Sequence, residues 1–219
     1  MLAPYARLET SAILALGAAG AGLTAWLAGW WALVPAAVAG ALLAFYRDPP
    51  RRVPCGPDVL LAPADGRIVR VERDYRATPD APPELRIVIF LSVLDVHVNR
   101  SPCAARVLEA RHTPGKFLNA LSAEATLANE NCLLTLAPAP PLPGPLHVRQ
   151  IAGLLAKRIV CAARPGATLA AGERYGMIKL GSQTELRAPE DERWRVGVSP
   201  GDRVRGGRTV LARLESTKA

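Results

Sequence analysis

The chain has 219 residues, of which 50% are hydrophobic and 21% charged, and its 27 Lys and Arg against 19 Asp and Glu make a net charge of +8. This length fits one modest domain with an appendage and excludes a large multidomain enzyme. The hydrophobic content excludes a disordered chain. Aromatic residues make up only 5%, too few for a nucleic-acid stacking platform, so we expect no nucleic-acid partner.

The cysteines do not form a metal-binding or disulfide pattern. Cys55, Cys103, Cys132 and Cys161 include no Cys-x-x-Cys pair, and the chain has only three histidines. We therefore expect no metal site. A chain of this size needs no disulfide framework to bury a core, so the cysteines are interpreted as buried small hydrophobes in a reducing compartment.

The first 46 residues contain a long apolar segment. No charged residue occurs from Thr10 to Tyr46, a run well beyond the roughly 20 residues of one helical membrane pass. Gly29-Trp30-Trp31 divides the run and predicts two helices, near Ser11–Leu27 and Trp31–Tyr46. Residues 1–46 are thus assigned to a membrane-anchoring hydrophobic hairpin, with one, two or re-entrant passes left open.

Basic residues flank this segment on both sides. Arg7 precedes it, and Arg47, Arg51 and Arg52 follow it. By the positive-inside rule both ends face the cytoplasm, which predicts a protein of the cell membrane with its catalytic domain on the cytoplasmic side. A cleaved signal peptide is the competing interpretation, but its apolar core is usually about 7–15 residues long. The net charge falls wholly in residues 47–219 and suits an anionic lipid surface or substrate.

Short apolar runs separated by Pro- or Gly-bearing stretches predict a mainly β domain at 47–219. Leu85–Ser92 is almost continuously apolar and is predicted to be a central buried strand. Leu118–Ala128 is predicted to be a helix and the Pro-rich Ala137–Pro145 a surface loop. The other expected strands are Val59–Ala62, Arg67–Val71, Cys132–Leu136, Leu146–Ile151, Lys157–Cys161, Met177–Leu180, Trp194–Val198 and Thr209–Leu214.

A short repeat occurs in the C-terminal third. Arg164–Gly172 aligns with Ser199–Gly207 at a constant offset of 35, and each copy reads Pro-Gly-x-x-apolar-x-x-Gly before another apolar run. The Pro-Gly pair and the later glycine predict tight turns around a very short strand. Such segments resemble the half-repeats of barrel–sandwich hybrid folds, which include lipoyl and biotinyl domains, so we expect a barrel-sandwich-hybrid-like β domain.

Four sequence motifs, taken together and in order, indicate a family far more specifically than any one of them does alone. They read A-P-A-D-G at Ala62–Gly66, L-S-V-L-D-V-H-V-N-R at Leu91–Arg100, T-P-G-K-F at Thr113–Phe117, and Y-G-M-I-K-L-G-S at Tyr175–Ser182. In this order, behind an apolar N-terminus, the chain resembles phosphatidylserine decarboxylase proenzymes of the short bacterial and archaeal type. The resemblance covers almost the whole chain.

This resemblance implies a self-processing enzyme that converts phosphatidylserine to phosphatidylethanolamine and CO2. The hydroxyl of Ser182 attacks the Gly181 carbonyl, an ester forms by N-to-O acyl shift, and elimination separates a β chain (1–181) from an α chain (182–219). Residue 182 becomes a covalent pyruvoyl group, the one cofactor implied, which forms a Schiff base with the substrate amine and accepts electrons as CO2 leaves. The implied partners are phosphatidylserine in the membrane and the two chains as a heterodimer; a higher homo-oligomer is left open.

Three further residues, His97, Asp65 and Lys116, are candidates for roles at this site. We expect His97 to share one face of a strand with Asp95 and Asn99. Histidine suits proton transfer near neutral pH. His97 is therefore the predicted proton donor, with Asp65 orienting it. Lys116, in a Pro-Gly loop, is the candidate contact for the lipid phosphate or carboxylate.

The chain departs from the family pattern at three places. Gln183 stands where the short type commonly has Arg, and Arg100 stands where the longer type has a second histidine. Asn129-Glu130-Asn131 lacks the arginine of the family's N-E-R-N stretch. These differences leave open which residue is the base for self-cleavage.

Two other functions compete with the decarboxylase. A membrane-tethered lipoyl- or biotinyl-like carrier module would want Lys at a hairpin tip, usually as Met-Lys-Met, but here the sequence is Met177-Ile178-Lys179. A serine hydrolase could use Ser182, His97 and Asp65, but no G-x-S-x-G elbow surrounds the serine.

Overall fold

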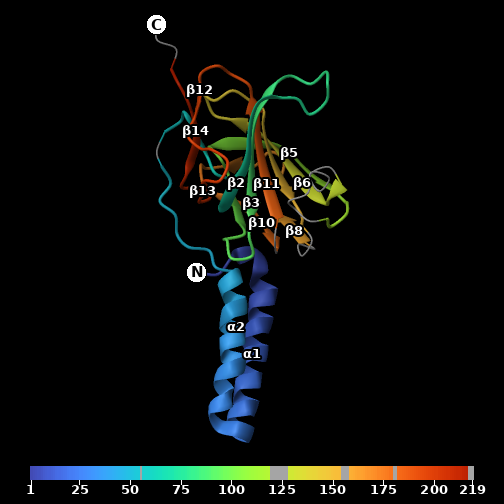
Figure 1. Ribbon diagram of the computed structural model, residues 1–219, viewed down its shortest axis with the longest axis vertical. Helices are drawn as coiled ribbons and strands as arrows, with labels where there is room; N and C mark the ends of the chain where they lie inside the picture. Colours follow the sequence, from blue (N-terminus) through green and yellow to red (C-terminus); the bar gives the residue numbers. More distant parts are fainter. Residues whose placement is uncertain (55, 119–127, 154–157, 180–181, 217–219) are drawn as a thin grey trace. The chain divides into compact units, whose positions relative to one another are not determined.

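The computed structural model describes residues 1–219 except 55, 119–127, 154–157, 180–181 and 217–219 (Figure 1). The chain divides into two compact units, Met1–Pro50 and Arg51–Ala219. The helix expected at Leu118–Ala128 falls almost wholly outside the described residues, so that prediction stays untested.

The first unit is a helical hairpin (Figure 1). Gly17 faces Ala39 so closely that an added Cβ would lie 2.6 Å from the alanine Cβ, which lets the helices approach. Pro4–Phe45 is long and apolar enough, by length and composition, to cross a membrane, with a mean hydropathy of 1.8. The predicted hairpin and its break are confirmed by helices η1 (Pro4–Ala6), α1 (Arg7–Ala28), η2 (Gly29–Ala32) and α2 (Leu33–Phe45).

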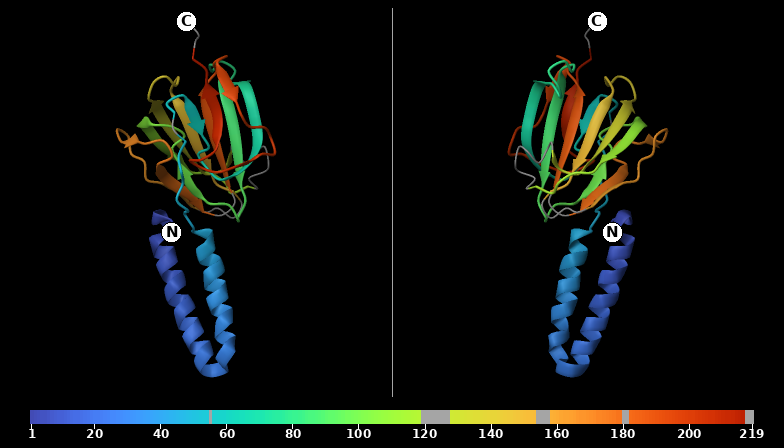
Figure 2. Two further views of the ribbon diagram at one scale, coloured as in Figure 1. Left: turned by 90° about the vertical axis from the view of Figure 1, so that its left-hand side faces the viewer. Right: turned by 90° about the vertical axis from the view of Figure 1, so that its right-hand side faces the viewer.

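The second unit is built on an eight-stranded, curled antiparallel sheet (Figure 2). On strands of this sheet every second side chain enters the core, as Leu85, Ile87 and Ile89 do, so one face of the sheet carries the core. In spatial order its strands are β13 (Arg203–Val204), β2 (Gly66–Tyr75), β3 (Glu84–Leu91), β11 (Ser182–Pro189), β7 (Leu146–Ile151), β6 (Asn131–Pro138), β5 (Ala105–Thr113) and β9 (Thr168–Leu169).

Two three-stranded sheets supply the other side of this core. Leu60, Tyr175 and Trp194 come from these small sheets and are buried with Ile89 and Leu186 of the large sheet in a single apolar cluster. The small sheets have the orders β1 (Val59–Leu61), β14 (Val210–Leu214), β12 (Trp194–Val196) and β4 (Val98–Arg100), β10 (Arg174–Lys179), β8 (Arg158–Cys161).

The strand orders reveal two similar halves related by a pseudo-twofold axis. The large sheet reads β13-β2-β3-β11 from one edge and β9-β5-β6-β7 from the other, and each half has one small sheet. Strands β4 and β5 begin 39 residues after β1 and β2, and their β-bulges, at Ile68/Arg70 and Val107/Glu109, share this offset. The half made of β4–β10 is therefore inserted between β3 and β11 of the other half.

The repeat seen in the sequence forms matching parts of the two halves. Strands β9 and β13 occupy equivalent positions 35 residues apart, at opposite edges of the large sheet. The glycines on either side have positive φ in both copies, 87° and 71° at Gly166 and Gly172 and 100° and 68° at Gly201 and Gly207. Glycine adopts such angles without steric cost, which explains why the repeat preserves them.

The predicted strands are confirmed to within a few residues wherever the structure describes them. Two long strands were missed, β5 and β11. Strand β5 is largely exposed, and β11 presents Gln183, Glu185 and Arg187 on one face, so neither has a strong apolar signal. With the helical hairpin, this architecture confirms the mainly β, barrel-sandwich-hybrid-like fold class.

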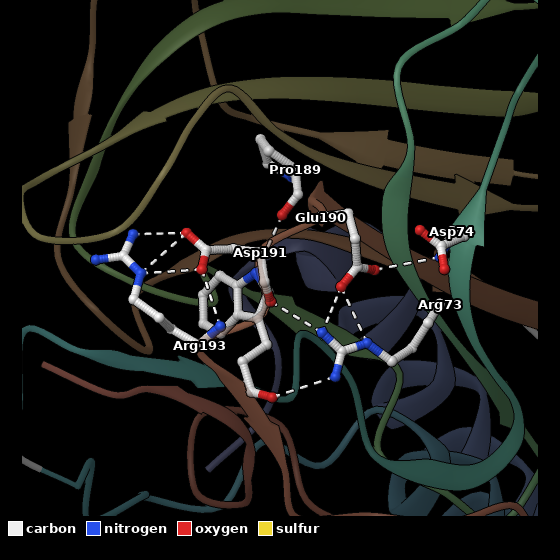
Figure 3. A network of polar contacts seen from close by, with 7 residues as sticks. Arg73, Asp74, Pro189, Glu190, Asp191 and Arg193 are labelled. Carbon is white, nitrogen blue, oxygen red and sulfur yellow. Dashed lines mark hydrogen bonds and ion pairs between the residues drawn. The ribbon is translucent and has the colours of Figure 1, made fainter. Parts of the chain in front are cut away.

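Ion pairs connect the segment after β11 to strand β2 (Figure 3). The Arg73 guanidinium donates to the Glu190 carboxylate, with Nε at 2.9 Å, and to the Asp191 carbonyl, also at 2.9 Å. The Glu190 carboxylate also accepts the Asp74 amide at 3.2 Å. This network fastens the C-terminal segment to a strand more than 100 residues earlier in the chain.

Candidate active site

Ser182 is the first residue of β11, in the middle of the large sheet. It pairs with Leu91, the last residue of β3, and Gln183 pairs with Ile151 on the other side. Ser182 is fully buried, and its Oγ has no hydrogen-bond partner among the described residues. A buried hydroxyl without a partner costs about 1–3 kcal/mol, so its presence here calls for a functional reason. Gly181 lies outside the described residues.

His97 is fully buried just before β4. Its Nδ1 lies 2.8 Å from the Asp95 carbonyl. Because a carbonyl oxygen can only accept, Nδ1 donates the proton of this bond, so in the neutral form of the ring Nε2 would be the nitrogen without a proton. The His97 carbonyl accepts from Ile178 at 3.1 Å, which joins this segment to β10.

The expected strand from Asp95 to Asn99 is only partly correct. Strand β4 begins at Val98, and Asp95 belongs to a turn in which its carboxylate accepts the Ser92 amide at 2.8 Å. A short carboxylate readily bonds nearby backbone amides, so the Asp95 side chain closes this turn. The contact of Asp95 with His97 is made by its backbone carbonyl and not by its side chain.

A hydrogen bond between the two layers aligns the histidine segment with the serine strand. Asn99 Nδ2 donates to Thr184 Oγ1 at 3.0 Å, and both residues are fully buried. Ser182 shares a face of β11 with Thr184, and His97 precedes Asn99 by the same two residues. The segment that leads to His97 begins immediately after Leu91, the partner of Ser182. His97 and Ser182 therefore lie at the same end of the Asn99–Thr184 contact.

Asp65 lies in the turn between β1 and β2 and is held by two donors. Arg51 Nη2 donates to Oδ2 at 2.7 Å, and the Gly206 amide donates to Oδ1 at 2.8 Å. Burial raises the pKa of Asp65, and Arg51 and Gly206 offset part of this rise. The turn is tied to the histidine strand, because the Arg100 amide donates to the Pro63 carbonyl at 2.8 Å. That Asp65 orients His97 stays a prediction.

The Pro-Gly-Lys-Phe loop also reaches this region. Lys116 is exposed, and its backbone exchanges hydrogen bonds with Ala128 and Glu130 at 2.8 and 3.0 Å. Phe117 packs against the cluster that contains Ile178 of β10. The loop is thus fixed beside the strand that leads towards Ser182, while the Lys116 side chain is left in solvent. A substrate contact for it stays a prediction.

Two of the departures from the family pattern have a structural account. Gln183 alternates with Ser182 and therefore faces the opposite side of β11, so this departure does not change the serine's own face. Arg100 is buried and donates from Nη1 to the Gly172 carbonyl at 3.1 Å, at a repeat turn.

The prediction that the cysteines are merely buried hydrophobes fits Cys103, in the core, where burial raises its pKa to about 12. It missed a pair: Cys132 on β6 forms a thiol hydrogen bond with Cys161 on β8. That bond, with help from the Ala163 amide, lowers the pKa of Cys161 to about 7. Cys55 is outside the described residues.

Among the residues that are described, no His, Cys, Asp and Glu side chains gather as a metal site.

Sequence reasoning also missed Arg51, Gln150 and Thr184, whose side chains complete the polar surroundings of the site. Gln150 Nε2 donates to Asn99 Oδ1 at 2.8 Å, which extends the contact between layers to β7. The one sequence signal for a polar contact here is a polar residue at a core-facing position of a strand, such as Gln150, which follows Val148 on the same face of L-H-V-R-Q-I-A.

Known proteins share this sequence over most of its length. A sequence model described as phosphatidylserine decarboxylase matches residues 38–212. A phosphatidylserine decarboxylase proenzyme of Rhodopirellula baltica is 46% identical over 190 residues, which cover 85% of this chain and 78% of the relative. One of Solibacter usitatus is 43% identical over 208 residues, 94% of this chain and 95% of the relative. The chain therefore belongs to the phosphatidylserine decarboxylase family.

Proposed function

We propose that this chain decarboxylates phosphatidylserine to phosphatidylethanolamine through a pyruvoyl group made from Ser182. The observation that carries the proposal is the buried hydroxyl of Ser182, which has no hydrogen-bond partner among the described residues. It lies at the end of β11 to which β10, bonded to the His97 carbonyl, leads. The names of the relatives, all of them proenzymes, support a chain that is processed after synthesis. Neither rival function accounts for a serine held in this way.

Self-cleavage would begin with attack of Ser182 Oγ on the carbonyl of residue 181. Nε2 of His97 is the basic nitrogen, so it is suited to take the hydroxyl proton and then protonate the departing amide nitrogen. The ester would be lost by elimination, which ends the β chain at residue 181. Addition of water and release of ammonia would leave a ketone at residue 182.

A group of this size fits the position. Ser182 is bordered by Leu91 and, beyond Ile151, by the fully buried Ala152. In a pyruvoyl group the CH2OH of the serine becomes CH3 and a ketone oxygen takes the place of the backbone nitrogen, so the conversion adds no bulk to the side chain and removes the buried hydroxyl. The pyruvoyl carbonyl would bond the substrate amine and withdraw electrons from the carbon that loses CO2. His97, as imidazolium, would then donate the proton that this carbon needs.

The two products of cleavage have extensive contacts with each other. Strand β11 pairs with β3 and β7, β13 pairs with β2, and β14 pairs with β1. Ion pairs also cross the cut, including a buried one between Arg86 and Glu185 at 2.6 Å. These contacts support a heterodimer of the two chains after cleavage.

The hairpin supports a membrane location for the reaction. Its large apolar side chains are exposed, among them Leu16, Trp26 and Trp30 at 73%, 82% and 68%. An apolar surface of this kind is unfavourable in water. We propose that it anchors the enzyme at the cell membrane, where its lipid substrate resides, with the catalytic domain on the cytoplasmic side.

Ser182→Ala should remain a single chain of 219 residues without decarboxylase activity, because alanine has no nucleophile for the acyl shift. The unaltered protein should separate into chains of 181 and 38 residues on denaturing electrophoresis, and intact mass should detect pyruvoyl on the shorter one. Ser199→Ala, in a repeat turn, is the control and should be cut normally. Cleavage of Ser182→Ala at the same bond would contradict the proposal.

His97→Ala should lower phosphatidylserine turnover by about 100-fold or more, as expected for loss of a general acid, and should slow chain separation. A time course of both chain separation and CO2 release tests this. His112→Ala is the matched control, because His112 is exposed and pairs only with Glu130 among the contacts described. Normal turnover by His97→Ala would exclude it from the reaction centre.

Arg51→Gln should shift the acid limb of self-cleavage to higher pH. Arg51 lowers the pKa of Asp65, so its loss should raise that pKa further, and a cleavage step that needs the Asp65 carboxylate would then require a higher pH. Cleavage rates across a pH series measure the shift. Arg52→Gln removes the same charge from an exposed neighbour and should not move the limb; equal shifts in both variants would point to a general charge effect.

Deleting residues 1–46 should move the protein from the membrane fraction towards the soluble fraction while chain separation persists. Turnover of phosphatidylserine in bilayers should fall more than turnover of a short-chain soluble analogue, since only the bilayer substrate needs the anchor. Fractionation followed by both assays measures this. Equal losses on the two substrates would show that the hairpin supports the fold rather than access to lipid.

A further inference from the structure

Three buried polar side chains form a continuous hydrogen-bonded line between the two layers of the second unit. Gln150 on β7 donates to Asn99 on β4 at 2.8 Å, and Asn99 donates to Thr184 on β11 at 3.0 Å. All three residues are fully buried. Gly176 makes room for the line, since a Cβ there would lie 3.1 Å from Gln150 Nε2 and 2.2 Å from the Val160 carbonyl.

The directions of these bonds depend on one another. The Gln150 amide nitrogen also lies 3.4 Å from the Val160 carbonyl, so the donors of Gln150 face Asn99 and β8. Asn99 must then accept with Oδ1, which turns its own nitrogen towards the Thr184 hydroxyl. Loss of any member would leave a buried polar partner unsatisfied. The line is therefore a single unit.

This unit crosses the proposed cleavage site. Asn99 and Gln150 belong to the chain that would end at residue 181, and Thr184 is the third residue of the chain that would begin at 182. Before cleavage the start of β11 is held covalently by the preceding residues. After cleavage it becomes a chain end, held by pairing with β3 and β7 and by the Thr184 contact, and chain ends fray unless they are tied down.

We propose that Gln150, Asn99 and Thr184 act as a clamp that holds the new N-terminal end of β11 against the His97 segment after the chain is cut. They are positioning residues: they keep residue 182 at the end of the Asn99–Thr184 contact where His97 lies. The clamp rests on the proposed function, because β11 has a free N-terminal end to hold only in a cleaved chain.

The test compares Thr184→Val, which keeps the shape but removes the hydroxyl, with Thr184→Ser, which restores a hydroxyl. Both full-length variants should separate into two chains within about threefold of the normal rate, because the covalent link holds β11 until the cut. Turnover by Thr184→Val should fall at least about tenfold in kcat and should largely recover in Thr184→Ser. Gln150→Met, which breaks the other link, should reproduce the loss if Thr184→Val does not fold.

Backbone hydrogen exchange of residues 183–186 gives a readout that does not depend on turnover. It should accelerate at least about tenfold in processed Thr184→Val, but not when the same substitution is placed in the uncut Ser182→Ala protein. Equal acceleration in cut and uncut proteins, or normal turnover and exchange in cut Thr184→Val, would overturn the clamp. A natural chain that never separates would instead contradict the proposed function.

Discussion

The antiparallel pairing of β3 with β11 is the constraint on which the candidate site depends. One half of the pseudo-symmetric domain is inserted between these two strands, so the chain leaves the first half after Leu91 and returns to it at Ser182. Because these two residues pair directly, the segment that leaves after Leu91 and the strand that begins at Ser182 meet at the same end of the sheet. The outgoing segment carries His97, and the returning one begins with the serine. Residues 85 positions apart are thus brought to one end of the sheet by strand register alone.

The two halves differ where chemistry is expected. Under the offset of 39 that relates β1 and β2 to β4 and β5, His97 corresponds to Asp58 and Asp65 corresponds to Ala104. Asp58 forms a partly exposed ion pair with Arg213, and an alanine in a turn needs no partner. A symmetric scaffold therefore requires neither a buried histidine nor a buried carboxylate at these positions. Burial of such groups is costly unless they are bonded, so their presence in one half only is better explained by function than by folding.

Local patterns predicted most of the fold, and the failures share a physical cause. The hairpin and the apolar strands have the periodicity of the surfaces they bury, and Leu146–Ile151 was predicted with its observed bounds. Strand β11 was missed because Glu185 and Arg187 form ion pairs with Arg86 and Glu84 of β3. No local pattern reveals such pairs. The motif residues define the candidate site, but Thr184 and Gln150 became part of it only through register between distant strands. The contact of Cys132 with Cys161 arises in the same way.

The topology also indicates that the proposed cleavage would follow folding. The 38 residues after the proposed cut contribute an inner strand and an edge strand to the large sheet and two strands to one small sheet. A fragment of that size cannot bury a core of its own. The hydroxyl of Ser182 becomes buried beside Leu91 only when β11 already lies between β3 and β7. An unfolded chain therefore has no means to orient the serine against a general base. In the folded chain the strand pairing fixes the position of Ser182, and after the proposed cut the same pairing would keep the product in place. A single set of contacts would then serve both the processing step and the enzyme that results.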